Sequence, residues 1–208
     1  MLSFSALVSF IGASILLTIA PGPDNLFVVA QSVSHGRKAG IATALGLCSG
    51  ITVHTMAAAL GISAILYQSD LAFRLMKYIG ALYLIYLACQ AIKERNVMAI
   101  EDKVEKQTGF SLYRRGIFMN VLNPKVALFF LAFLPQFVQP QNGNIPGQFV
   151  LLGLIFMLQA VIIMTGIAVC SGSFGRKFLN QPRVAGCINL LKASIFAVIG
   201  IRLALAER

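Results

Sequence analysis

Hydrophobic stretches long enough to cross a membrane follow one another along almost the whole chain, separated by short polar segments. A transmembrane helix needs about 20 mostly apolar residues. The pattern predicts six such helices, at about residues 4–34, 40–67, 71–92, 112–138, 147–171 and 184–206. The chain of 208 residues is therefore expected to be an all-α integral membrane protein with a single transmembrane domain.

The first predicted helix is interrupted near its middle by Pro21, Gly22 and Pro23, followed by Asp24 and Asn25. Proline removes a backbone hydrogen bond, and a carboxylate is costly in hydrocarbon. A membrane helix tolerates such a break only where it is buried in protein or lines a wet cavity. We expect a functional break; a kinked packing helix with a hydrogen-bonded Asp24 is the alternative.

The fourth predicted helix has a matching break at Asn123, Pro124 and Lys125. When the two breaks are aligned, Pro23 corresponds to Pro124 and Asp24 corresponds to Lys125. Proline-interrupted hydrophobic segments at corresponding positions of two halves indicate the binding site of a transporter.

Each half of the chain has three predicted helices, so the second half enters the membrane with the opposite polarity. This predicts two inverted repeats, at about residues 1–92 and 112–208, joined by a polar cytoplasmic loop at about 93–111. The segments between helices 1 and 2, 3 and 4, and 5 and 6 contain the lysines and arginines that mark the cytoplasmic side. The segments between helices 2 and 3 and between helices 4 and 5 contain none. Both termini are therefore expected outside, or the N-terminus inside if the first helix does not cross fully.

The composition also indicates a membrane protein, because 58% of the residues are hydrophobic and 12% are charged. Soluble domains have about 25% charged residues. The net charge of +10 does not indicate nucleic-acid binding, since the basic residues lie in short clusters between apolar segments. The four cysteines are single, so no metal site, cofactor or enzymatic activity is predicted. A membrane-embedded redox or structural protein remains an alternative.

Several motifs resemble those of the LysE/RhtB family of amino-acid exporters, and the resemblance covers essentially the whole chain. The motifs are Pro21–Asn25, Gly36–Gly40, Lys77–Leu84 and Asn120–Lys125 followed by Ala127–Phe130. The resemblance implies a multi-pass protein of the bacterial inner membrane that exports amino acids by exchange with protons or another ion. One departure is Lys192–Ile195, where the family often has a glycine.

An amino acid is a zwitterion, so its site needs an acceptor for the ammonium and donors for the carboxylate. We expect Asp24 to bind the ammonium, while Lys125 and the half-helix N-termini at Pro23 and Pro124 bind the carboxylate. The alternative is a direct ion pair between Asp24 and Lys125 that only holds the two halves together. Both can apply if the pair opens for substrate.

Asp24 is one of few acidic groups available, which favours small neutral substrates such as threonine, homoserine, leucine or cysteine over basic amino acids or another small solute. His54, inside the second predicted helix, is a candidate proton relay, and a hydrogen-bonded packing role is the alternative. Gly46 and Gly50 permit close helix contact, which we expect within the fold; a homodimer in the lipid membrane stays open. The coupling ion is also open.

Overall fold

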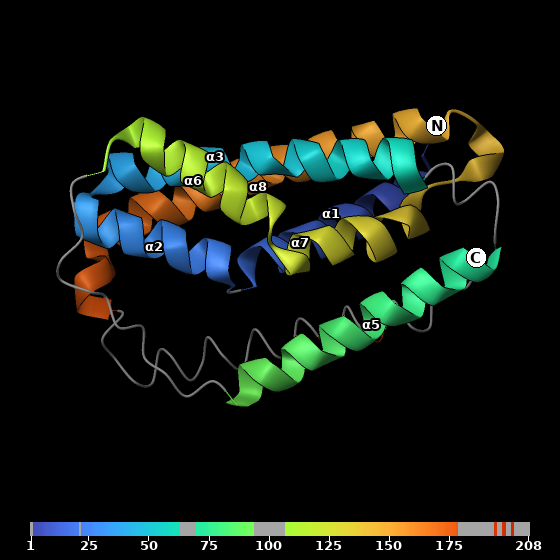
Figure 1. Ribbon diagram of the computed structural model, residues 1–208, viewed down its shortest axis with the longest axis horizontal. Coiled ribbons are helices and arrows are strands. Elements are labelled where there is room, and N and C mark those ends of the chain that lie inside the picture. The colour runs from blue at the N-terminus through green and yellow to red at the C-terminus, as the bar shows by residue number, and fades with distance from the viewer. Residues whose placement is uncertain are drawn as a thin grey trace.

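The computed structural model describes residues 2–20, 22–62, 70–93 and 107–178, together with 194, 197–198 and 201. Every regular element in these ranges is a helix (Figure 1). The all-α prediction is therefore confirmed. Pro21, most of the polar loop and nearly all of the sixth predicted helix lie outside the described residues, so the count of six helices stays a prediction.

The first predicted helix is broken where the prolines predict it. Helix α1 spans Phe4–Ile19 and helix α2 spans Pro23–His35, with a bend of 54° between them. Ser3 caps the start of α1 by accepting a hydrogen bond from the Ala6 amide. Pro23 occupies the first turn of α2, the position that proline favours because the N–H there has no partner in the helix.

The fourth predicted helix is broken in the same way. Helix α6 spans Gly109–Val121, and helix α7 spans Pro124–Leu128, after a bend of 48°. The chain continues helically through a π-helical turn, η2 (Phe129–Phe133), and a 3₁₀ turn, η3 (Leu134–Phe137). Both predicted breaks are therefore real features of the backbone.

Three longer helices and a short 3₁₀ turn, η4 (Pro140–Asn142), complete the helical elements of the described residues. Helix α3 spans Arg37–Ala57 and continues as a π-helical turn, η1 (Ala58–Ile62); helix α5 spans Asp70–Lys93; and helix α8 spans Ile145–Phe178. Helix α8 runs on through residues 175–177, which include Arg176 and Lys177, past the predicted end at about residue 171. Arginine and lysine are good helix formers, so their charge alone does not end a helix.

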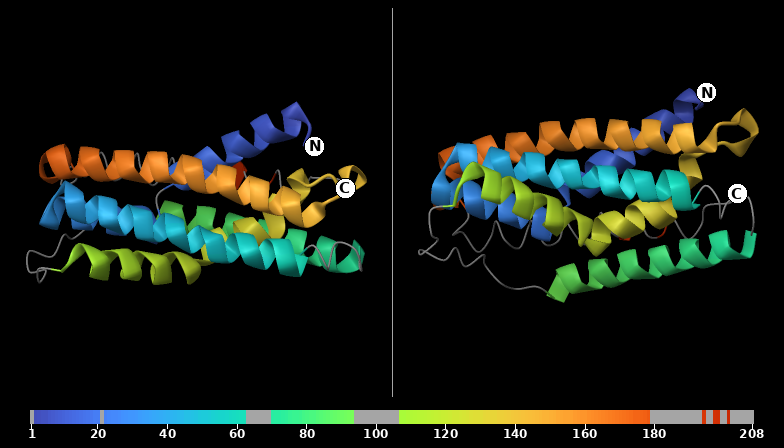
Figure 2. Two further views of the ribbon diagram at one scale, coloured as in Figure 1. Left: turned by 90° about the horizontal axis from the view of Figure 1, so that it is seen from above. Right: turned by 45° about the horizontal axis from the view of Figure 1, so that its top comes forward.

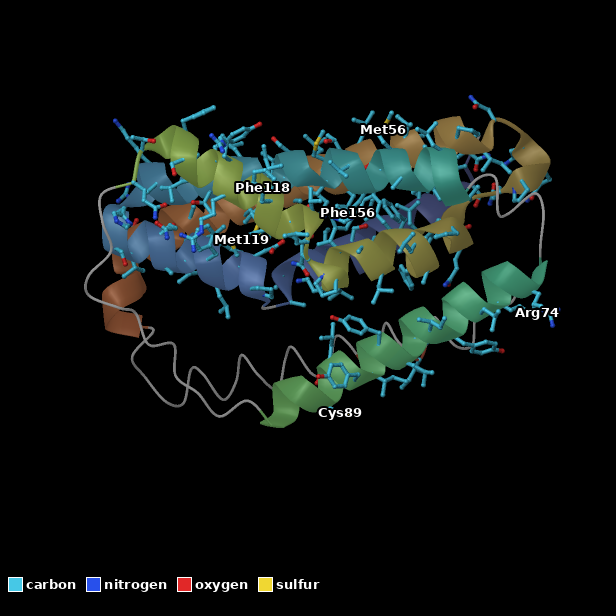
Figure 3. All side chains as sticks on the ribbon, viewed as in Figure 1. Met56, Arg74, Cys89, Phe118, Met119 and Phe156 are labelled. Carbon is cyan, nitrogen blue, oxygen red and sulfur yellow. The ribbon has the colours of Figure 1, made fainter. Side chains whose placement is uncertain are left out.

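The apolar lengths agree with a membrane protein. Arg37–Gly61 and Ile145–Ser173 are each long and apolar enough to cross a membrane, and each bent pair also qualifies as one span, which gives up to four spans among the described residues. Large apolar side chains such as Met56 and Phe118 point outward, whereas Phe156 lies inside the bundle (Figure 3). The outer surface is therefore suited to lipid.

The helices pack around α3 and α8, which lie side by side in all views (Figures 1 and 2). Helix α6 packs on α3, and helix α2 packs on α8. Helix α2 also packs on α3, the helix that follows it in the chain. The two inverted repeats stay a prediction, because nearly all of the sixth predicted helix lies outside the described residues. Helix α5 runs along one side of the other helices and contacts η2 (Figure 1).

A cluster of phenylalanine rings lies next to the second break. The ring of Phe129 lies 5.1–6.3 Å, between centroids, from the rings of Phe10, Phe130, Phe133 and Phe156. These separations are typical of favourable aromatic pairs. The cluster joins α1 and α8 to η2, and it surrounds the break with buried apolar side chains.

Helices α3 and α6 approach closely at three glycines. A Cβ on Gly46 would overlap the carbonyl oxygen of Tyr113, and a Cβ on Gly116 would lie 2.6 Å from the carbonyl oxygen of Thr43. A Cβ on Gly50 would lie 2.8 Å from the Cβ of Asn120. The expectation that Gly46 and Gly50 make a helix contact within the fold is therefore confirmed.

We expect Gly46→Ala to destabilise the folded protein by about 1–3 kcal/mol, because α3 and α6 must move apart to admit the methyl group. The measurement is the Tm of the purified protein in detergent. Gly166→Ala in α8 is the matched control, since a Cβ there meets nothing within 4 Å. Equal Tm values for the two variants would contradict the close contact.

Candidate functional site

The two breaks meet inside the bundle, and the polar side chains there are almost fully buried. Asp24 is 2% exposed, Asn120 is 3% exposed and Lys125 is 5% exposed. The predicted site residues that the structure describes, Gly22 to Asn25 and Asn123 to Lys125, all lie in this region, whereas Pro21 lies outside the described residues.

Lys125 reaches from α7 to the open end of α1. Its Nζ donates to the carbonyl oxygens of Leu17 at 3.1 Å and Ala20 at 3.0 Å. In an uninterrupted helix the Leu17 carbonyl would accept from residue 21, but that residue is a proline and has no N–H. The ammonium therefore satisfies a carbonyl that the proline leaves without a partner, and its charge complements the negative end of the helix.

The amide of Asn25 acts at the same end of α1. Its Nδ2 donates to the Thr18 carbonyl oxygen at 2.9 Å, with longer contacts to the Ile19 and Ala20 oxygens at 3.4 and 3.5 Å. Ile19 stands four residues before Pro23, so its carbonyl also lacks a helical partner. Side chains from both halves of the chain thus close the first break.

The second break is closed by His54 of α3. Its Nε2 donates to the Asn120 carbonyl oxygen at 3.0 Å, and the Asn123 amide donates to the same oxygen at 2.9 Å. Asn120 stands four residues before Pro124, which cannot supply the usual N–H. The hydrogen-bonded packing role of His54 is therefore present, and its role as a proton relay stays a prediction.

The N-terminus of α7 is satisfied locally. Asn123 Oδ1 accepts from the Lys125 amide at 2.9 Å, as an N-cap residue does. Part of the anion-binding capacity that we expected at this half-helix is thus already used by its own cap. The N-terminus of α2 differs, because its cap residue is Gly22, which has no side chain to accept these amides.

Asp24 lies in the first turn of α2, where the helix dipole favours a negative charge. Its Oδ2 accepts from Asn120 Nδ2 at 3.0 Å, whereas its Oδ1 is buried and has no hydrogen-bond partner in the described structure. The hydrogen bonds seen for Asp24 and Lys125 thus run to Asn120 and to the end of α1. These bonds join the two breaks, and a direct ion pair between Asp24 and Lys125 stays an untested alternative.

Asn120 is the site residue that the sequence analysis missed as a functional group. It links Asp24 to His54, since its amide binds the first and its carbonyl binds the second. A signal was present in the sequence, because a polar residue four positions before a helix-breaking proline carries a carbonyl without a helical partner.

Gly22 provides space next to Lys125. A Cβ on Gly22 would lie 3.2 Å from Lys125 Nζ, which is tighter than an ordinary contact. The backbone of Gly22 is extended, with φ −156°, so any residue could adopt its conformation. Glycine is therefore favoured here by the room that the ammonium needs.

A small cavity of about 20 Å³ lies between these groups, enough for about one water molecule. Its polar side is formed by Thr18, Asp24, Asn120 and Lys125. The remaining lining comes from Leu17, Leu47, Cys48, Ile51, Val126, Phe156, Ala160 and Met164. An amino acid is larger than this cavity, so binding one requires the bundle to open.

A hydrogen bond from α8 reaches one of the polar residues that line the cavity. Gln159 Nε2 of α8 donates to Thr18 Oγ1 at 2.9 Å. No group of three or more metal-ligating side chains comes together among the described residues, and Cys48, Cys89 and Cys170 are free thiols. The polar side chains that line the cavity can bind charged and polar groups.

The chain is similar to known proteins over almost its whole length. The family model of the LysE type translocator matches residues 15–207. A homoserine/homoserine lactone efflux protein of Salmonella typhimurium is 28% identical, over 99% of each chain. An uncharacterised membrane protein of Vibrio cholerae is 29% identical, over 96% of this chain and 97% of its own, and YrhP of Bacillus subtilis is 27% identical, over 97% and 99%. No solved structure matches this chain.

Proposed function

Since this chain belongs to the family of LysE-type translocators, we propose that it exports small neutral amino acids from the cytoplasm. It is a multi-pass membrane transporter and not an enzyme. We place it in the bacterial inner membrane with both termini outside, as the distribution of lysine and arginine favours.

The observation that carries the proposal is the meeting of Asp24 and Lys125 at one buried cavity. Ionisable groups inside a membrane protein are costly, and they commonly mark the path of a substrate or ion. Asp24 offers a buried carboxylate oxygen, and Lys125 offers an ammonium, so the two charges of an amino-acid zwitterion have complementary partners.

The lining of the cavity supports a neutral substrate. Asp24 is the single acidic side chain among the described residues that line it, and the substrate's α-ammonium would occupy that charge. A basic amino acid would bring a second positive charge with no acidic partner there. Apolar residues such as Ile51, Phe156 and Met164 instead suit an apolar or hydroxyl-bearing side chain.

We propose that the proton motive force drives the export. Asp24, His54 and Lys125 are buried groups of the site that can exchange protons, and His54 is joined to Asp24 through Asn120. A relay through this chain would have to open the His54 hydrogen bond to the Asn120 carbonyl, so it would act only during the transport cycle.

The proposal is tested with proteoliposomes that contain the purified protein and a panel of labelled amino acids. We expect accumulation of threonine, homoserine, leucine or cysteine against their gradients when a pH gradient is imposed, and no accumulation of lysine or arginine. Protein-free liposomes and liposomes treated with an uncoupler are the controls. Transport of no amino acid would refute the function, and flux that only runs downhill would indicate a channel.

A further inference from the structure

We propose that the ammonium of Lys125 occupies the subsite of the substrate's own α-ammonium, and that substrate binding exchanges one ammonium for the other. This inference rests on the proposed export of amino acids. It assigns the ammonium subsite to the carbonyl oxygens of Leu17 and Ala20 together with Asp24 Oδ1.

The open end of α1 is already shaped to bind a primary ammonium. Lys125 Nζ lies 3.1 Å from the Leu17 oxygen and 3.0 Å from the Ala20 oxygen, both at hydrogen-bond distance. The α-ammonium of an amino acid has the same three N–H donors as a lysine ammonium. A group that satisfies these carbonyls in place of Lys125 would therefore have the chemistry of the substrate's ammonium.

Asp24 provides an acceptor that the subsite has not yet used. The residue is 2% exposed, and its Oδ1 has no hydrogen-bond partner in the described part of the chain. Asp24 lines the same small cavity as Lys125. A buried carboxylate oxygen without a donor is unfavourable, so an incoming ammonium that reaches Oδ1 gains a bond that stabilises it over the lysine.

The displaced Lys125 would then have a new partner. Its side chain is a flexible stem of four carbons, and Gly22 leaves the space beside Nζ free of a side chain. The substrate carboxylate arrives next to its own ammonium, so Lys125 Nζ can bind the carboxylate after it leaves α1. The net charge of the site changes only by that of the substrate, and a zwitterion has no net charge. After the exchange, each ammonium lies beside oxygen acceptors.

The same exchange explains how the carrier returns without substrate. Unpaired carbonyls in the membrane interior cost several kcal/mol each. With Lys125 back on Leu17 and Ala20, the empty carrier keeps the break satisfied and can close to the small cavity seen here. Lys125 thus acts as a tethered competitor of the substrate.

The test compares amine binding by the wild type and by Lys125→Met, which removes the tethered ammonium. The probe is 3-aminopropan-1-ol, a primary amine without a carboxylate, and propane-1,3-diol is the matched uncharged probe. If Lys125 fills the subsite more than nine-tenths of the time, its removal should tighten amine binding roughly tenfold or more. Affinity for the diol should not change. The affinity for each probe is measured by calorimetry and by the rise in Tm that the probe causes.

Three further variants make the result specific. Arg115→Met removes a positive charge outside the cavity, where the guanidinium lies over Phe27, and should leave amine affinity unchanged. Asp24→Asn added to Lys125→Met should abolish the gain. If Lys125→Met does not fold, Lys125→Gln keeps an uncharged donor that competes less strongly for the carbonyls, so it should show a smaller gain in amine affinity in the same direction.

Equal amine affinity of the wild type and the folded Lys125 variant would overturn the inference and leave Lys125 as a structural cap. A gain for the diol as large as for the amine would also overturn it, because the added space alone would then explain binding. Failure of the proposed function would appear elsewhere, as absence of amino-acid transport by the wild type.

Discussion

Asp24→Asn should reduce amino-acid export at least tenfold while the protein remains inserted and folded. The asparagine keeps an oxygen that accepts from Asn120 Nδ2, so the link between the two halves survives. It removes the charge that the substrate's ammonium requires, and hydrogen bonds to charged groups contribute about 1.5–3 kcal/mol. The measurement is the initial rate of transport in proteoliposomes, together with the Tm of the purified variant.

The hydrogen bonds seen at the site explain why Asp24→Asn should still fold. Removing one member of a buried ion pair leaves a stranded charge and costs about 3–5 kcal/mol. Lys125, however, keeps its bonds to the Leu17 and Ala20 carbonyls whether or not Asp24 is charged. Asp70→Asn, at the start of α5, is the control for loss of an acidic side chain. Transport by Asp24→Asn at more than half the wild-type rate would contradict a substrate-binding role.

The exchanged variant, Asp24→Lys combined with Lys125→Asp, should fail to give a stable protein. An aspartate at position 125 would face two carbonyl oxygens, so acceptors would meet acceptors at the end of α1. A lysine at position 24 would stand in the first turn of α2, where the helix dipole disfavours a positive charge, and would meet the amide donor of Asn120. Both charges would then be buried without suitable partners.

This result is measured as the yield of monodisperse protein in detergent, its Tm and its transport rate, with Asp24→Asn as the folded reference. A direct ion pair would make the opposite prediction, since exchanging its two members keeps the attraction. Recovery of wild-type Tm and transport by the exchanged variant would therefore show that Asp24 and Lys125 act mainly on each other.

Much of the fold follows from local properties of the sequence. The length of each apolar segment determines whether a helix can cross the membrane, as in the span within α8 (Ile145–Ser173). The positions of both breaks follow from Pro23 and Pro124, because the lack of an N–H is a covalent property of each residue. The presence of buried charge follows from Asp24 and Lys125, which stand inside apolar segments.

The partners of these groups were decided by the tertiary structure. Three contacts could not be predicted from spacing: Lys125 on the end of α1, His54 on the Asn120 carbonyl, and Asn120 on Asp24. Each joins residues 66 to 108 positions apart in the chain. The sequence determines which carbonyls lose their helical donors, but helix packing determines which side chain is near enough to replace each donor, because hydrogen bonds act over about 3 Å and only the folded bundle brings these groups together.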